Sequence, residues 1–221
     1  MTTRRTFLRA ATLGSFGLAA RVQAAPSRRR ENGFFGVHPF VEKHPEAVFI
    51  MRTKVNRLMN SRAKLAEGLR FGRSVFVPAD ERGTPVNVTI PVKPNLKTPL
   101  NPEKYPIEQV IGTTTDPSFT EGVFKALIEL GISGSHIHMR ETNRIEGLKN
   151  YGYFEMAERL GASLRRDLQT TIDTLRPGRD YNWIDVPDGV VFERIPRLEP
   201  LGVPGAWMLN IAKFKAHYMG M

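Results

Sequence analysis

The segment PVNVTIPVKPN, residues 85–95, decides the fold class of this chain. Four apolar residues in it alternate with polar residues or proline: Val86, Val88, Ile90 and Val92. This period of two is typical of a β-strand. The strand must end by Pro94, and Pro91 within it predicts an edge position or a bulge, because proline donates no hydrogen bond to a neighbouring strand.

The segment DPSFTEGVFKALIELG, residues 116–131, is the clearest helix in the sequence. Asp116 can cap its N-terminus, Pro117 suits its first turn, and Gly131 suits its C-terminal end. Its apolar residues recur at the spacing of one buried helix face: Phe119, Val123, Leu127 and Leu130.

The rest of the chain alternates between strand and helix patterns. We predict further strands at 47–55, 135–143, 190–196 and 206–214, and further helices at 60–76, with Ser61 as N-cap, and at 153–168, with a break at Gly161. This alternation predicts an α/β fold with a largely parallel sheet and flanking helices, incomplete at one edge.

The first 24 residues read as an export signal. Arg4 and Arg5 begin the pattern T-R-R-x-F-L-R, and a short, weakly apolar stretch and small residues suited to cleavage follow. The stretch is too short and too rich in small residues to predict a stable membrane span. The order is similar to a twin-arginine signal, which predicts a periplasmic or otherwise exported protein and the twin-arginine machinery as a partner. An ordinary Sec signal or a basic amphipathic tail is the alternative.

The remaining sequence predicts two further regions. Residues 25–46 are rich in Pro, Gly and charge, which predicts an exposed lead-in, and residues 47–221 predict a single α/β domain. With 41% hydrophobic and 24% charged residues, the chain is typical of a globular protein.

Composition also excludes several classes of site. The chain has no cysteine, so it holds no disulfide, thiolate nucleophile or cysteine-ligated metal cluster. The net charge of +10 falls to +6 beyond the leader, and no basic–aromatic repeat occurs, so we predict no nucleic-acid partner. No glycine-rich phosphate loop, G-x-S-x-G, H-E-x-x-H or CxxC motif is present.

Polar side chains follow three of the predicted strands. Because the carboxyl ends of parallel strands share one edge, where open α/β sheets form their sites, we expect these side chains to lie together. They are Lys93 and Asn95 after the first strand, Arg140 and Glu141 after the second, and Lys213, Lys215 and His217 after the third.

Two interpretations of these strand ends stay open. On an extended chain Lys213, Lys215 and His217 share one face, where the lysines could bind an anion and the histidine could transfer protons. Glu141 could serve as a carboxylate base or pair with a lysine. The alternative is a solvated strand end with ordinary ion pairs and a plain turn after Lys93.

His136 and His138 form a separate pair. Two imidazoles at this spacing on a strand could bind a divalent ion. Both come early in the strand, away from the expected site, so we favour a surface or hydrogen-bonded pair and predict no metal ligands.

Several segments of the sequence also resemble those of a known family. They are the twin-arginine leader, HPFVEKHPEAVFIMRTKV, FGRSVFVP, IPVKPNL, TDPSFTEGVFKALIELG, GYFEMAERLGASL and LNIAKFKAHYMGM, which span most of residues 38–221. Together they resemble exported members of the domain-of-unknown-function 362 family. The most specific parts are K-P-N-L and K-x-K-x-H, and by position the resemblance points to Lys93, Asn95, Lys213, Lys215 and His217.

The resemblance carries implications for chemistry. Some family members carry ferredoxin-like iron–sulfur clusters, which implies a redox role, although such a cluster would have to lie outside this cysteine-free chain. The strand–turn–helix layout is also similar to nickel-cofactor lactate racemases, which implies isomerisation by analogy of fold alone. In the family a further region follows K-x-K-x-H, so we expect these 221 residues to be the N-terminal part of a longer protein.

We therefore expect an exported α/β protein with a small-molecule site at the carboxyl edge of its sheet. The expected catalytic residues are His217, Lys213 and Glu141, and the expected ligand-binding residues are Lys93, Asn95, Lys215 and Arg140. The ligand would be a small anion; the sequence identifies no cofactor and leaves redox and isomerase chemistry open. The competing hypothesis is a non-catalytic periplasmic module that binds an anionic ligand or docks a partner, with a shallow basic edge and no enclosed pocket.

Overall fold

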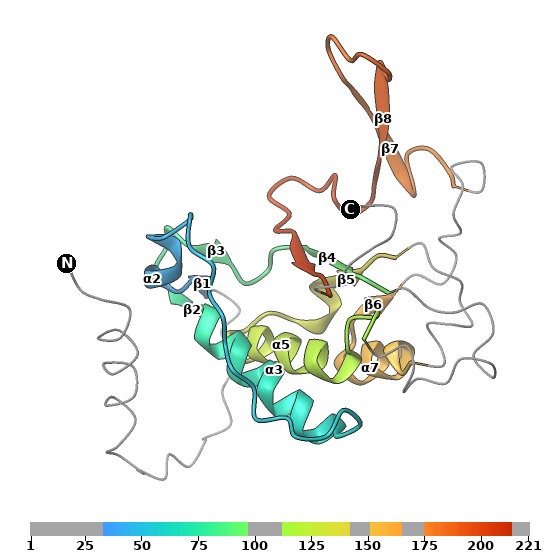
Figure 1. Ribbon diagram of the computed structural model, residues 1–221. Helices are drawn as coiled ribbons and strands as arrows, with labels where there is room; N and C mark the ends of the chain where they lie inside the picture. Colours follow the sequence, from blue (N-terminus) through green and yellow to red (C-terminus); the bar gives the residue numbers. More distant parts are fainter. Residues whose placement is uncertain (1–32, 97–111, 142–150, 165–174, 214–221) are drawn as a thin grey trace. The chain divides into compact units, whose positions relative to one another are not determined.

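The computed structural model describes residues 33–96, 112–141, 151–164 and 175–213, all within a compact unit that spans 31–221. The elements, drawn in Figure 1, are β1 (Phe34–Val37), α2 (Pro39–Glu42), α3 (Ser61–Val75), β2 (Phe76–Ala79), β3 (Thr84–Pro85), β4 (Ile90–Pro94), α5 (Pro117–Glu129), the short 3₁₀ helix η1 (Gly134–His136), β5 (Ile137–Met139), α7 (Tyr153–Leu160), β6 (Ser163–Leu164), β7 (Tyr181–Asp185), β8 (Arg194–Leu198) and β9 (Leu209–Ile211).

Four of the strands form a parallel sheet in the order β6-β5-β4-β9. Helices flank this sheet, so the predicted α/β class with a parallel sheet is confirmed. Within the described residues β6 and β9 are its outer strands. The expectation that the sheet is incomplete at one edge stays a prediction.

The core lies between this sheet and α5. The sheet residues Ile90, Val92, Ile137 and Met139 are at most 1% exposed, and they belong to one apolar cluster with Val123, Phe124 and Leu127 of α5. The predicted cap of α5 is confirmed, because Asp116 Oδ1 accepts a hydrogen bond from the Phe119 backbone N at 3.0 Å.

Helix α3 packs on α5 at glycine contacts. A Cβ atom at Gly68 would overlap the carbonyl oxygen of Phe119, and one at Gly122 would overlap the carbonyl oxygen of Leu65. Side chains cannot separate the two backbones here, so both positions require glycine. The N-cap of α3 is Asn60 rather than the predicted Ser61, since the Asn60 side chain accepts from the Ala63 backbone N at 3.0 Å.

A small antiparallel sheet, in the order β2-β1-β3, corrects the expected lead-in. Strand β1 and helix α2 lie inside residues 25–46, and Phe35 is fully buried. Trp207 contacts Phe35 and Phe76 edge-on, with ring centroids 5.3 and 5.6 Å apart. The high content of Pro, Gly and charged residues in this region gave no indication that the side chain of Phe35 is buried.

The strand predicted at 47–55 is wrong. The segment forms no strand, and Val48 and Ile50 are 86% and 91% exposed. The structure instead holds this segment by a hydrogen bond at 2.8 Å, from Arg70 Nη2 on α3 to the carbonyl oxygen of Arg52. Its β-branched residues favour extended backbone, but strand pairing also needs a partner.

Pro91 does not mark an edge, because β4 pairs with both β5 and β9. The Val92 carbonyl accepts from the Arg140 backbone N at 2.9 Å, so β4 presents Val92 to β5. Alternation turns the Pro91 nitrogen toward β9, where the paired residues begin at Val92 opposite Leu209, after one backbone hydrogen bond from Trp207 N to the Thr89 carbonyl at 2.9 Å. A central strand can therefore contain a proline just before the position where its pairing with the second neighbouring strand, β9, begins.

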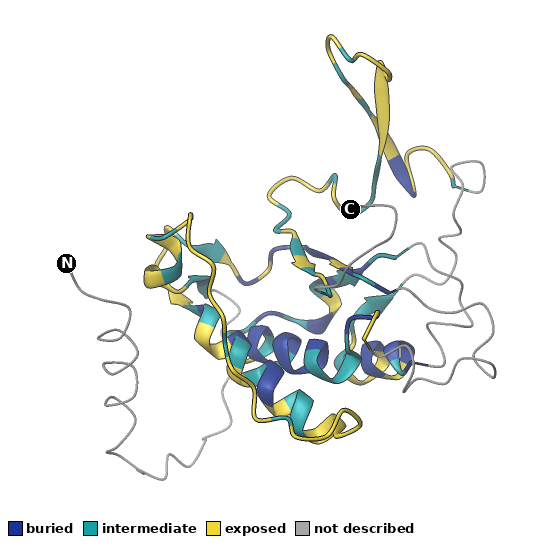
Figure 2. Cartoon of the chain, in the orientation of Figure 1, coloured by how far each residue is buried: buried dark blue, intermediate teal, exposed yellow. Residues whose placement is uncertain are grey.

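The later elements also differ from expectation. Gly161, with φ 66°, ends α7 instead of interrupting it, and β6 follows; residues 165–168 of the predicted helix lie outside the described residues. Strand β8 pairs antiparallel with β7, which the sequence analysis missed, and β9 is shorter than the predicted 206–214. Figure 2 shows the β7–β8 hairpin largely exposed and α5 largely buried.

Candidate functional site

The parallel register brings the polar strand ends to one edge. Val92 lies opposite both Met139 of β5 and Leu209 of β9. The polar residues at the carboxyl ends of these three strands therefore lie at the same side of the sheet, as the sequence predicted. Lys93 is the last residue but one of β4 and lies opposite Asn210 of β9, so it does not follow the strand as expected. Asn95, Arg140, Glu141 and Lys213 follow their strands.

Lys93 and Glu141 meet at this edge. Lys93 Nζ lies 2.8 Å from Glu141 Oε2, and the same oxygen accepts the Leu96 backbone N–H at 3.1 Å. The Glu141 side chain is only 9% exposed, whereas that of Lys93 is 47% exposed. The ion pair therefore joins a fixed, mostly buried carboxylate to an ammonium group that solvent can reach.

Thr115 holds the end of β4 to the end of β9. Its Oγ1 accepts a hydrogen bond from the Asn95 backbone N at 3.1 Å and donates one to the Ile211 carbonyl at 3.0 Å. Its backbone N also donates to the Asn95 carbonyl at 2.8 Å. These contacts fix the Asn95 backbone, while its half-buried side chain makes no hydrogen bond to another described residue.

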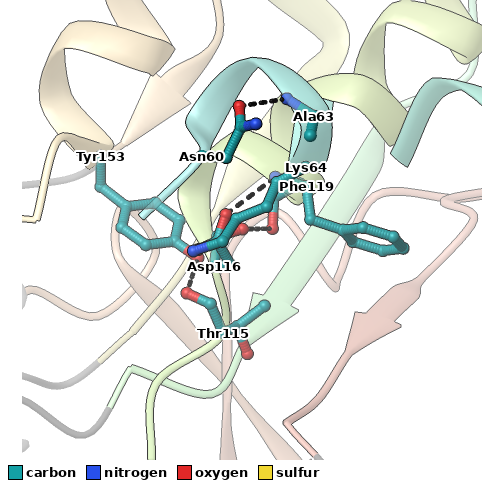
Figure 3. Close-up of polar contacts among 8 residues, drawn as sticks. Asn60, Ala63, Lys64, Thr115, Asp116, Phe119 and Tyr153 are labelled. Carbon is teal, nitrogen blue, oxygen red and sulfur yellow. Dashed lines mark hydrogen bonds and ion pairs between the residues drawn. The ribbon is translucent and has the colours of Figure 1, made fainter. Parts of the chain in front are cut away.

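Polar contacts hold Thr115 and Asp116 in place at the start of α5 (Figure 3). Lys64 Nζ of α3 lies 2.6 Å from Asp116 Oδ2, and both side chains are mostly buried. Tyr153 of α7 donates its hydroxyl proton to the Thr115 carbonyl at 2.7 Å. Burial raises the pKa of Tyr153 far above its ordinary value, so the phenol stays protonated and remains a donor.

Arg140 joins the end of β5 to the turn after β8. Its Nε donates to the Glu199 carbonyl at 3.1 Å, and its Nη1 donates to the Met139 carbonyl at 2.8 Å. These two backbone contacts hold the guanidinium of Arg140 at the carboxyl ends of the strands.

A cavity of about 310 Å³ lies against these groups. Three charged residues, Lys93, Arg140 and Glu141, are among its lining residues, and the surface that they present to the cavity is apolar. Its apolar lining residues are Pro91, Val92, Leu198, Leu201 and Met208. The wall of this cavity therefore matches the apolar part of a ligand.

A second cavity, of about 380 Å³, lies where α3, α5 and α7 begin. Its charges pair largely with one another, since Lys64 contacts Asp116 and Arg159 contacts Glu121 at 2.7 Å. These pairs hold the three helices together, and we assign the cavity a structural role.

The other predicted site residues are placed only in part. Lys213 is half-buried and follows β9 by two residues, at the expected edge. Lys215, His217, Arg4 and Arg5 lie outside the described residues, so the expected clustering of Lys213, Lys215 and His217 stays a prediction.

His136 and His138 do not share a strand face, because His136 belongs to η1 and only His138 lies in β5. Burial, with the nearby charges of Arg140 and His136, lowers the pKa of His138, which favours a neutral imidazole near neutrality. No group of three or more potential metal ligands occurs in the part of the chain that the structure describes.

The sequence analysis missed Thr115 and the apolar side of the cavity. A run of three threonines before the helix cap, Thr113 to Thr115, was the available signal for the first. No local signal marked the apolar lining residues, because the fold of β8 and of the segment after it places them there. They are Leu198, Leu201 and Met208.

Comparison with known protein families, curated proteins and solved structures found no match in any of the three. In the described ranges, no helix has the length and apolar character needed to cross a membrane.

Proposed function

We propose that this chain is an exported α/β protein that binds a small anionic molecule at the carboxyl edge of its parallel sheet. The supporting observation is the meeting of two strand ends beside a cavity. Lys93 and Glu141, far apart in the sequence, pair at 2.8 Å and line the same space. Sites at this edge are the general rule for open α/β sheets.

The exposure of the Lys93 side chain supports an anion as the ligand. Lys93 is half-exposed, so an anion can reach its ammonium group while Glu141 keeps its hydrogen bond from the Leu96 backbone. Charge-assisted hydrogen bonds of this kind are the stronger ones in proteins.

Chemistry on the bound molecule is a further part of the proposal. The resemblance to the domain-of-unknown-function 362 family supports redox or isomerase chemistry, with Glu141, Lys213 and His217 as the residues that move protons. Lys215 and Asn95 would then hold and orient the anion with Lys93. The described cavity, of about 310 Å³, supports a site for a small molecule beside these residues.

The export proposal rests on the leader, with its paired Arg4 and Arg5. Replacing both by lysine should retain the protein in the cytoplasm, as measured by cell fractionation, because the twin-arginine pathway reads this pair as an address. Unchanged export of that variant would contradict a twin-arginine route.

The binding proposal is tested by calorimetric titration of the full chain with three probes: acetate, inorganic phosphate and octanoate. At least one should bind, and Lys93→Gln should weaken its binding about tenfold, because a hydrogen bond to a charged group contributes roughly 1.5–3 kcal/mol. Lys43→Gln removes an exposed lysine that does not line the cavity and is the matched control. The absence of binding by all three probes, or equal binding to both variants, would contradict the proposal.

A further inference from the structure

Resting on the proposed function, we infer that the bound anion carries an apolar body, as in a medium-chain aliphatic or aryl carboxylate. The segment from Leu198 to Met208 would then determine specificity. This inference names the class of ligand, which the charge of the strand ends alone leaves open.

The first observation is the division of the cavity lining. Lys93, Arg140 and Glu141 come from the ends of β4 and β5, whereas three large apolar side chains come from β8 and the segment that follows it: Leu198, Leu201 and Met208. Leu201 is 37% exposed and Met208 is 53% exposed. A ligand that covers them removes apolar surface from water next to the point where its charge is bound.

The second observation is the physical link between the two parts. Arg140 Nε, at the charged part, donates to the carbonyl oxygen of Glu199 at 3.1 Å. Glu199 lies between the two apolar residues Leu198 and Leu201, and the Leu201 backbone N donates to the Leu198 carbonyl at 3.0 Å. Arg140 is therefore a positioning residue that holds the apolar turn beside the cationic groups.

The third observation is the size of the cavity. Its volume of about 310 Å³ is that of a small-molecule pocket. Acetate or phosphate would leave most of the apolar lining in water. An amphipathic anion would contact both parts at once.

Three probes separate the two contributions: acetate carries only the charge, octan-1-ol only the chain, and octanoate both. We expect the full chain to bind octanoate at least tenfold more tightly than acetate or octan-1-ol, since each buried methylene strengthens binding roughly fourfold. Leu201→Ala should weaken octanoate binding several-fold. Leu58→Ala, at an exposed leucine outside the cavity, is the matched control.

The outcomes distinguish this inference from the proposed function. If acetate or phosphate binds as tightly as octanoate in a Lys93-dependent manner, the anion site stands and the apolar specificity is overturned. If octan-1-ol binds as tightly as octanoate, or Leu201→Ala has no more effect than Leu58→Ala, the inference is also overturned. If no anion binds, both fail together.

Discussion

Two mostly buried carboxylates, Glu141 and Glu121, have different partners and different roles. Glu141 binds a half-exposed lysine and a backbone N–H at the edge of the sheet. Glu121 of α5 lies between Lys125, at 2.9 Å, and Arg159 of α7, at 2.7 Å. The first arrangement leaves its cation accessible to a ligand, whereas the second fastens one helix to another.

The ionisation of Glu121 predicts a pH dependence of stability. Burial disfavours its charged form, but hydrogen bonds from Arg159 and Lys125 outweigh burial and hold the pKa of Glu121 below its ordinary value of 4.5. A depressed folded-state pKa stabilises the fold above the unfolded-state pKa, and this contribution is lost as the pH falls through the folded-state value.

Glu121→Gln should therefore destabilise the chain at pH 7 by roughly 1–3 kcal/mol, because its cationic partners lose their charged acceptor. The difference in Tm from the wild type should shrink below pH 4.5, where the wild-type carboxylate begins to gain its proton. Thermal melts of the wild type and variant between pH 7 and pH 3 measure this, with the exposed Glu81→Gln as control. A Tm difference that is constant with pH would contradict it.

At the scale of elements, the packing of α3 on α5 positions the N-terminus of α5, which lies next to the candidate site. The two helices approach at Gly68 and Gly122, and Asp116 at the start of α5 pairs with Lys64 of α3. Thr115, one residue earlier, holds β4 and β9 together. The packing of two helices is thus connected directly to the geometry of the strand ends.

Gly122→Ala should destabilise the chain by about 1–3 kcal/mol, because its added methyl group would overlap the backbone of α3 and force the helices apart. Gly112→Ala is the control, since a Cβ at Gly112 meets no atom within 4 Å. Urea denaturation of both variants measures the difference in the free energy of unfolding. Equal stability of the two variants would show that the helices can separate without cost.

Local signals account for the elements that the sequence predicted. Asp116 and Pro117 lie next to the residues they act on, and the apolar spacing of α5 is contained within one helix. The hairpin β7–β8 and the two-sided pairing of β4 depend on distant partners, which no short segment specifies. Residues 47–55 have a local preference for extended backbone, but they pair with no strand, so they form none.

At the scale of the whole molecule, chain connectivity made part of the site predictable. Parallel strands necessarily expose their carboxyl ends at one edge, so Lys93 and Glu141 could be placed together from the sequence. The apolar lining could not, because Leu198 and Leu201 come from a distant part of the chain, whose turn bonds to Arg140 through the Glu199 carbonyl. The charged residues of the site were therefore predictable from the sequence, and its apolar lining was not.

Binding of an anion at this edge is tested most directly by amide NMR of the ¹⁵N-labelled full chain titrated with octanoate. The account predicts that the largest chemical-shift changes fall on the backbone amides at the strand ends, those of Lys93, Leu96, Arg140 and Glu141. The amides of Ser118 and Gly152, which line the second cavity, should change little. Unchanged strand-end amides at saturating octanoate, or larger changes at Ser118 and Gly152, would contradict it.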